Sequence, residues 1–172
     1  MLNRCVLGNP HSINPTSNAA SEFARQARES VLEFFNASTE DYTVVFTANA
    51  SGALKLVGEA YPFGSDSQLL LTVDNHNSVN GIREFARAKA TPVTYVPVVA
   101  PDLRVDLPAL REQLKRIAFG SNSLFAYPAQ SNLSGVQHPL GWIALAKEQG
   151  WDVLLDAAAF VPTNRLDRSL AA

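Results

Sequence analysis

Hydrophobic residues recur along the chain in two alternating patterns, as short continuous runs and as longer amphipathic stretches. The short runs predict strands over residues 43–46, 69–73, 92–96, 123–127 and 152–155, and the amphipathic stretches predict helices over 21–36, 51–61, 78–88, 107–117 and 140–149. Regular alternation of strand and helix is typical of a mostly parallel sheet covered by helices. We therefore expect an α/β fold with three layers, α/β/α, in a strand order that the pattern does not reveal.

The beginning of the chain differs from this pattern. Residues 8–17 contain two prolines and several small polar residues, which predicts an extended arm ahead of a helix that begins near Asn18. The only linker-like stretch runs from Val96 to Asp106, with prolines at 97 and 101. We expect a single domain, with an arm over residues 1–18 and an α/β core over 19–172.

Composition narrows the class of protein. Hydrophobic residues make up 47% of the 172 and charged residues 17%, as in an ordinary globular domain. The 16 acidic and 14 basic residues are scattered, so we expect no nucleic-acid partner. No run has the length of a membrane span or a signal peptide, and the single cysteine, Cys5, excludes an internal disulfide. These features predict a cytoplasmic protein without a membrane partner.

The most informative residue is Asp156, because it ends the apolar run that starts at Trp151 and precedes three alanines. An ionised carboxylate is unfavourable in a buried position unless an opposite charge or several donors meet it. Open α/β sheets bind their ligands at the carboxyl ends of strands. A protonated heterocyclic nitrogen is a fitting partner for Asp156, and the alternative is a carboxylate that caps the alanine-rich segment.

A second cluster, Thr47 to Leu54, runs from a predicted strand directly into a helix and consists mainly of small residues. Free amides at a helix start, the positive end of the helix dipole and a serine hydroxyl favour a phosphate-binding site there. The alternative is that Asn49 or Ser51 simply caps the helix.

Two further clusters follow predicted strands. In Asp74–Ser78, His76 is placed to stack on a planar ligand or to act as an acid or base, unless Asn77 or Ser78 merely caps the next helix. In Pro128–Gly135, Asn132 offers an amide to a ring hydroxyl, although an asparagine near a glycine is commonly a turn residue.

Several other chemistries are disfavoured. His11, His76 and His138 are far apart and lack the paired spacing of a zinc site, so we expect no metal. A catalytic role for Cys5 has no paired histidine motif to support it. The chain contains neither GxxxxGK[ST] nor GxGxxG, which argues against an ATPase or a dinucleotide oxidoreductase.

Five segments taken together resemble the class V aminotransferase family of pyridoxal 5′-phosphate (PLP) enzymes. They are Gly8–Ser12, Val45–Ala53, Asp74–Val79, Tyr127–Asn132 and Leu155–Phe160, and they extend over nearly the whole chain. Within the family the chain most resembles the branch of molybdenum cofactor sulfurase and its bacterial relatives, which are kin of the cysteine desulfurases.

The resemblance implies a role for each matching residue. Ala50 and Ser51 would hold the cofactor phosphate, and His76 would stack on the pyridine ring. Asn132 would contact the 3-hydroxyl oxygen of the ring, and Asp156 would pair with the protonated ring nitrogen, which makes the cofactor an electron sink. The resemblance further implies PLP as cofactor, His76 and Asp156 as catalytic residues, an amino acid such as L-cysteine as substrate, and a homodimer.

The sequence departs from the family at two points. Many cysteine desulfurases carry glutamine three residues after the aspartate, where this chain has Ala159. The Schiff-base lysine of the family lies downstream of the aspartate, whereas the lysines here are Lys55, Lys89, Lys115 and Lys147, all in predicted helices or, for Lys89, directly at the end of one.

These departures, together with the missing small carboxy-terminal domain of the family, favour a partial PLP-binding large domain that is inactive alone. The alternatives are a non-catalytic PLP-binding, phosphate-binding or dimerisation remnant, and a generic binder of phosphosugars or nucleotides.

Overall fold

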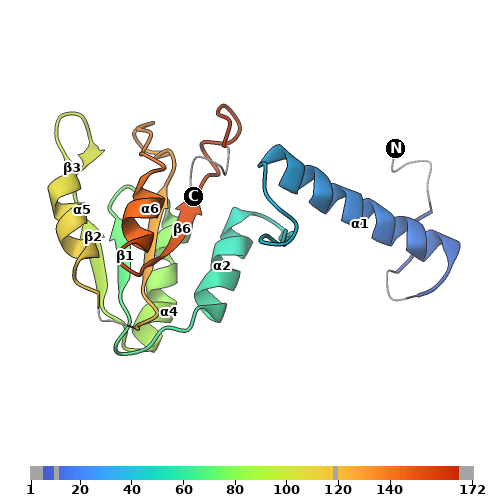
Figure 1. Cartoon of the computed structure of the whole chain (residues 1–172), viewed down its shortest axis with the longest axis horizontal. Helices are drawn as coiled ribbons and strands as arrows, with labels where there is room; N and C mark the ends of the chain where they lie inside the picture. The colour runs from blue at the N-terminus through green and yellow to red at the C-terminus, as the bar shows by residue number, and fades with distance from the viewer. Residues whose placement is uncertain (1–5, 10–11, 118–119, 167–172) are drawn as a thin grey trace. The chain divides into compact units, whose positions relative to one another are not determined.

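The structure is a computed structural model that describes residues 6–9, 12–117 and 120–166 (Figure 1). Contacts between the described residues divide them into two compact units, one up to residue 45 and the other from residue 46 to residue 166. The contacts therefore place the first helix outside the α/β unit, whereas the sequence analysis set the boundary at residue 18. Cys5 and His11, which were considered as candidate chemistry, lie outside the described residues.

The first unit contains one long helix, α1 (Pro15–Phe34). The side chain of Asn14 accepts a hydrogen bond from the backbone N–H of Ser17 at 2.9 Å and caps the helix. Pro15 occupies the first turn, where its fixed φ suits a helix and its missing N–H costs nothing. The helix consequently begins before Asn18, and the prediction of an extended arm through residue 18 is wrong.

The prediction of a strand over residues 43–46 is also wrong. No described strand pairs with this segment, and Val45 and Phe46 are 62% and 53% exposed. A β-strand needs a neighbouring strand to satisfy its peptide groups, and an apolar run alone does not provide one.

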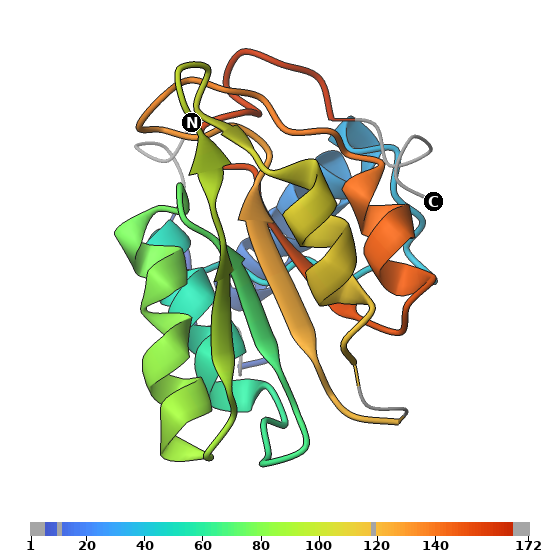
Figure 2. The same cartoon turned by 90° about the vertical axis from the view of Figure 1, so that its left-hand side faces the viewer.

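The second unit is built on a parallel sheet of four strands (Figure 2). The strands are β1 (Leu69–Thr72), β2 (Val93–Val96), β5 (Leu124–Pro128) and β6 (Asp152–Asp156), in the order β2-β1-β5-β6. Every residue of the central strands β1 and β5 is buried, whereas the edge strands β2 and β6 are mostly half-buried. The predicted mostly parallel sheet is confirmed.

Helices cover both faces of this sheet (Figure 2). They are α2 (Ala50–Ala60), α3 (Asn77–Asn80), α4 (Ile82–Ala88), α5 (Leu107–Leu114) and α6 (Trp142–Lys147). Leu69 and Leu71 of β1 belong to the core beneath α2, α3 and α4, and Leu70 between them belongs to the core beneath α5 and α6. The alternation of side chains along a strand thus produces the expected three layers.

Two predicted segments differ in detail. The helix expected over 78–88 is divided at Gly81 into α3 and α4. The linker expected over 96–106 contains a two-stranded antiparallel sheet, β3 (Val98–Val99) and β4 (Arg104–Val105). Strands of two residues are too short to produce a recognisable hydrophobic period.

The connections define where a ligand site is expected. The chain leaves β1 through α3 and α4 on one face of the sheet, and it leaves the neighbouring strand β5 through α6 on the other face. A crevice opens at the carboxyl ends of two adjacent strands whose connections diverge in this way. Throughout the part of the chain that the structure describes, no helix has both the length and the apolar character of a membrane span.

Candidate cofactor-binding site

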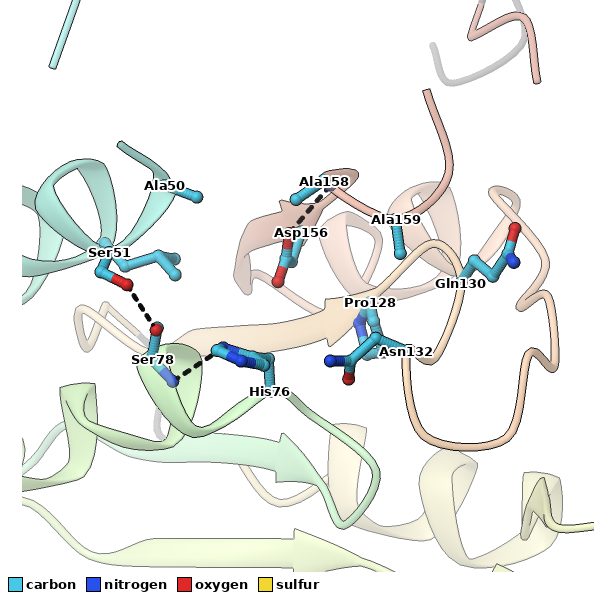
Figure 3. Close-up of a pocket in the computed structure, with 11 residues that line it drawn as sticks. Ala50, Ser51, His76, Ser78, Pro128, Gln130, Asn132, Asp156, Ala158 and Ala159 are labelled. Carbon is cyan, nitrogen blue, oxygen red and sulfur yellow. Dashed lines mark hydrogen bonds between the residues drawn. The ribbon is translucent and has the colours of Figure 1, made fainter. Parts of the chain in front are cut away.

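A pocket of about 290 Å³ lies at the carboxyl ends of the strands, beside the start of α2 (Figure 3). Its lining consists of Ala50, Ser51, Leu54, His76, Ser78, Pro128, Gln130, Asn132, Asp156, Ala158 and Ala159. The structure therefore brings together all five residues that the sequence analysis selected, from four separate segments of the chain. None of the lining residues is a lysine or an arginine.

The first wall is the start of α2. Asn49 caps this helix, since its Oδ1 accepts from the N–H of Gly52 at 2.9 Å. The first N–H groups of a helix have no partner within it, so those of Ala50 and Ser51 remain able to donate to an anion. The cap is confirmed at Asn49, and because the proposed phosphate groups are on other residues, the phosphate site stays a prediction that the cap does not oppose.

A pair of hydroxyls adjoins these amides. The Oγ atoms of Ser51 and Ser78 lie 2.6 Å apart and join α2 to α3 (Figure 3). Because one hydroxyl donates to the other, the pair retains a second O–H proton that can be donated to a ligand. From the sequence, Ser78 was predicted only as a possible helix cap, because its contact with Ser51 gives no local signal.

The second wall is His76, which directly precedes α3. Its Nδ1 accepts from the N–H of Ser78 at 3.2 Å and caps the short helix, so the expectation that Asn77 or Ser78 does so is wrong. An accepting Nδ1 carries a lone pair, which places the proton of the neutral ring on Nε2. The His76 side chain is exposed and its ring borders the pocket.

The third wall is Asp156 at the end of β6. Its Oδ1 accepts from the N–H of Ala158 at 3.0 Å, so the capping alternative is also realised. Figure 3 shows the carboxylate turned toward the space bounded by Ser51, His76 and Asn132. The expectation of a buried carboxylate is wrong: Asp156 is half-exposed, because β6 is an edge strand of the described sheet.

The fourth wall is the loop after β5. Its turn is closed by a hydrogen bond from Gly135 N–H to the Ser131 carbonyl at 2.9 Å, with Gly135 at a φ of 74°. Asn132 is exposed within this turn and borders the pocket, so the turn interpretation holds as well. Gln130 is a pocket residue to which the sequence analysis gave no role; its Oε1 accepts from Gln137 Nε2 at 3.3 Å.

Asp74, two residues before His76, forms an ion pair that the sequence did not reveal. His138 Nε2 lies 2.7 Å from Asp74 Oδ2, and both side chains are buried. Burial alone would raise the pKa of the Asp74 carboxyl, but the hydrogen bond and charge of His138 hold that pKa below its usual range. The sequence analysis weighed His138 only as a metal ligand, because two residues 64 positions apart give no local signal of their contact.

None of the four lysines is among the residues that line the pocket. Lys55 is in α2 and Lys147 in α6, whereas Lys89 and Lys115 end α4 and α5. All four are exposed. Among the described residues there is also no group of three or more histidine, cysteine, aspartate or glutamate side chains suited to a metal ion.

Comparison with known proteins decides the family. The profile of the Aminotransferase class-V family matches residues 4–170. The chain belongs to this family. The match confirms the resemblance drawn from the five sequence segments.

Curated relatives of this class V chain are named molybdenum cofactor sulfurase. The protein from Bos taurus is 41% identical over 184 residues, covering 96% of this chain and 20% of the relative. The protein from Arabidopsis thaliana is 39% identical over 185 residues, covering 89% of this chain and 23% of the relative. The chain thus spans about a fifth of the length of these relatives.

Solved structures share the fold of the class V chain. A cysteine desulfurase from Thermococcus onnurineus has a TM-score of 0.77 at 23% identity, over 98% of this chain and 40% of its own. A cysteine desulfurase from Escherichia coli has a TM-score of 0.74 at 23% identity, over 94% and 41%. A C-DES variant whose structure contains glycine covalently linked to PLP has a TM-score of 0.72 at 21% identity, over 94% and 42%.

Proposed function

We propose that this chain forms a non-covalent binding site for PLP, with the phosphate at the start of α2 and the ring between His76, Asn132 and Asp156. The observation that carries the proposal is the convergence of these groups in one pocket. The polar groups of the pocket fit the cofactor. Backbone amides and hydroxyls at the start of α2 suit its phosphate, and the Asp156 carboxylate, which has no lysine or arginine beside it in the lining, suits its ring nitrogen.

The phosphate end is built for an anion. The N–H groups of Ala50 and Ser51 and the spare hydroxyl proton of the Ser51–Ser78 pair all donate, and the helix dipole adds favourable charge. Since no lysine or arginine lines the pocket, these donors must provide most of the phosphate affinity.

The ring end is built for a flat, protonated heterocycle. The Asp156 carboxylate would pair with a protonated ring nitrogen, the imidazole of His76 would stack on the ring, and the Asn132 amide would donate to the ring hydroxyl oxygen. PLP bound in this way supplies an electron sink for charge at the α-carbon of an amino acid. Ala159 presents only a methyl group to the pocket, so it adds no donor to the ring hydroxyl.

No lysine lines the pocket, and this limits the activity that we propose for the chain by itself. We infer that this chain alone binds PLP without turning over an amino acid, because it offers no amine there to carry the cofactor or move a proton. A protein that joins this segment to a suitably placed lysine would act on an amino acid, and the names of its relatives point to sulfur transfer from cysteine. Without such a lysine the chain would be a PLP-binding module, for which we propose the homodimer implied by the family.

The test is equilibrium dialysis of the chain against PLP. We expect saturable binding that borohydride treatment does not make permanent at any pocket residue, as judged by mass spectrometry. Asp156→Ala should weaken PLP binding but leave competition by inorganic phosphate unchanged. A chain with no saturable PLP binding would contradict the proposal, and PLP affinity unaffected by Asp156→Ala would favour the generic phosphosugar or nucleotide binder.

A further inference from the structure

We propose that the buried pair of Asp74 and His138 is the positioning element of the pocket, which holds the loops that carry His76 and Asn132 at the separation a flat ring requires. This inference rests on the proposed PLP site. Neither residue lines the pocket, so both act through the residues beside them.

The position of the pair supports this role. Asp74 lies in the loop after β1, two residues before His76, and His138 closes the loop after β5 that contains Asn132. Their side chains are 4% and 2% exposed, and a second oxygen of Asp74, Oδ1, has no hydrogen-bond partner among the described residues. The bond from His138 therefore connects the Asp74 carboxylate to the loop after β5.

Further hydrogen bonds connect the pair to the end of β6, which carries Asp156. The backbone N–H of His138 donates to the Ala129 carbonyl at 2.9 Å, and the N–H of Ala129 donates to the Asp156 carbonyl at 2.8 Å. A continuous series of hydrogen bonds thus runs from the end of β1 through the loop of β5 to the end of β6. Movement of His138 would be transmitted to the strand ends that carry pocket groups.

The hydrogen bond between Asp74 and His138 is directional, whereas an apolar contact at the same place would not be. A buried ion pair gains little net stability, because both charges must be desolvated, but its hydrogen bond holds only within a narrow range of distance and angle. The His138 ring is fixed in turn by stacking on Trp142, with centroids 5.2 Å apart and planes inclined by 23°. The pair therefore fixes the position of one loop relative to the other, and does more than fill space in the core.

Three substitutions test the inference, with PLP affinity measured by equilibrium dialysis and inorganic phosphate as competitor. His138→Phe removes the donor and keeps a ring against Trp142, so we expect PLP affinity to fall at least tenfold while competition by phosphate changes less than twofold. His138→Gln keeps an N–H near the position of Nε2 and should restore affinity to within about threefold of the unmodified chain. Asp74→Asn, which keeps the size of the side chain and removes its charge, gives the measurement if His138→Phe does not fold, with an expected loss of several fold.

Tyr61→Phe is the matched control, because it removes a 2.7 Å hydrogen bond to Asp152 at the amino end of β6, away from the pocket. Its PLP affinity should be unchanged. The inference is overturned if folded His138→Phe binds PLP normally, if His138→Gln binds no better than His138→Phe, or if phosphate competition weakens as much as PLP binding. An unmodified chain that binds no PLP overturns the proposed function itself and this inference with it.

Discussion

The two sides of the pocket differ in how the protein uses its polar groups. Below the pocket, Asp74 and Asn75 are buried and bonded to other parts of the chain, with Asn75 Nδ2 donating to the carbonyls of Thr72 and Ala126 at 3.0 Å each. Along the rim, Ser51 and His76 are exposed, and the side chain of each makes one hydrogen bond, to Ser78 in both cases. Buried groups that bond to other segments of the chain help to fix the loops of the site, whereas groups open to solvent are available to a ligand.

This difference explains why neighbouring residues in one sequence cluster have opposite roles. Asp74 and His76 belong to the same strand-end segment, yet one faces the interior and the other the pocket. Substitutions in the buried side should therefore affect stability first, and substitutions along the rim should affect ligand binding first. The following predictions test this separation.

The largest effect is expected from Asp74→Ala, which leaves His138 buried without its partner. Breaking a buried ion pair by removing one member costs about 3–5 kcal/mol, so the free energy of unfolding measured by urea titration should fall by about that amount. Asp156→Ala on the rim removes one exposed hydrogen bond and should cost about 1 kcal/mol. Equal losses in the two variants would contradict the division between buried side and rim.

Lowering the pH should reduce the free energy of unfolding by a smaller amount, through the protonation of Asp74. Because the pKa of Asp74 is lower in the folded chain than the unfolded value of about 3.9, the folded state binds fewer protons at low pH. The stability that Asp74 contributes is therefore complete above about pH 4 and is lost as the pH falls through the lowered pKa.

The difference in unfolding free energy between the unmodified chain and Asp74→Asn, measured by urea titration from pH 6 downward, isolates this effect. Subtraction removes the parallel contribution of Glu22, whose pKa is lowered to about 2 by its hydrogen bond with Arg25. A difference that does not shrink with acid would contradict the assignment to Asp74.

On the rim, Asp156→Asn should reduce PLP affinity about tenfold, since a charge-assisted hydrogen bond is roughly twice as strong as a neutral one and 1.4 kcal/mol corresponds to a factor of ten. The unfolding free energy without ligand should be nearly unchanged. Equilibrium dialysis and urea titration of the same preparation check both statements, and a variant that loses stability but keeps affinity would reverse the comparison.

The smallest effect is expected from Ser51→Ala, which removes one of two hydroxyls but leaves both backbone amides at the start of α2. We expect PLP affinity to fall a few fold, corresponding to a net hydrogen-bond contribution of about 1 kcal/mol. Unphosphorylated pyridoxal serves as the control ligand, and its affinity should not change. A similar loss for pyridoxal would place Ser51 at the ring rather than at the phosphate.

Much of the fold was predictable because it rests on local patterns. The mainly apolar runs of β1 and β5 identified the central strands, and the amphipathic period of α2 and α5 identified helices to within a few residues. The segment 43–46 shows the limit of this reasoning, since its apolar residues resemble a strand but no described strand pairs with it. Pairing is a non-local property that an apolar run cannot encode.

The candidate site was predictable for a related reason. Ala50, Ser51, His76, Asn132 and Asp156 each follow an apolar run or begin a helix, and parallel strands gather such positions at one edge of a sheet. The helix caps were harder to assign, because Asn77, Ser78 and His76 all offer acceptors and only the backbone geometry selects His76.

The sequence by itself determined the α/β class, the polar clusters at the strand ends and the lack of a lysine near them, because each is encoded in neighbouring residues. Only the tertiary structure decided the strand order, the partial exposure of Asp156 and the pairing of Asp74 with His138. These depend on which strands become neighbours and which become edges, so they are set by contacts between residues that are distant along the chain. The buried pair shows the reason most directly, since its two halves become a unit only when β1 and β5 lie side by side.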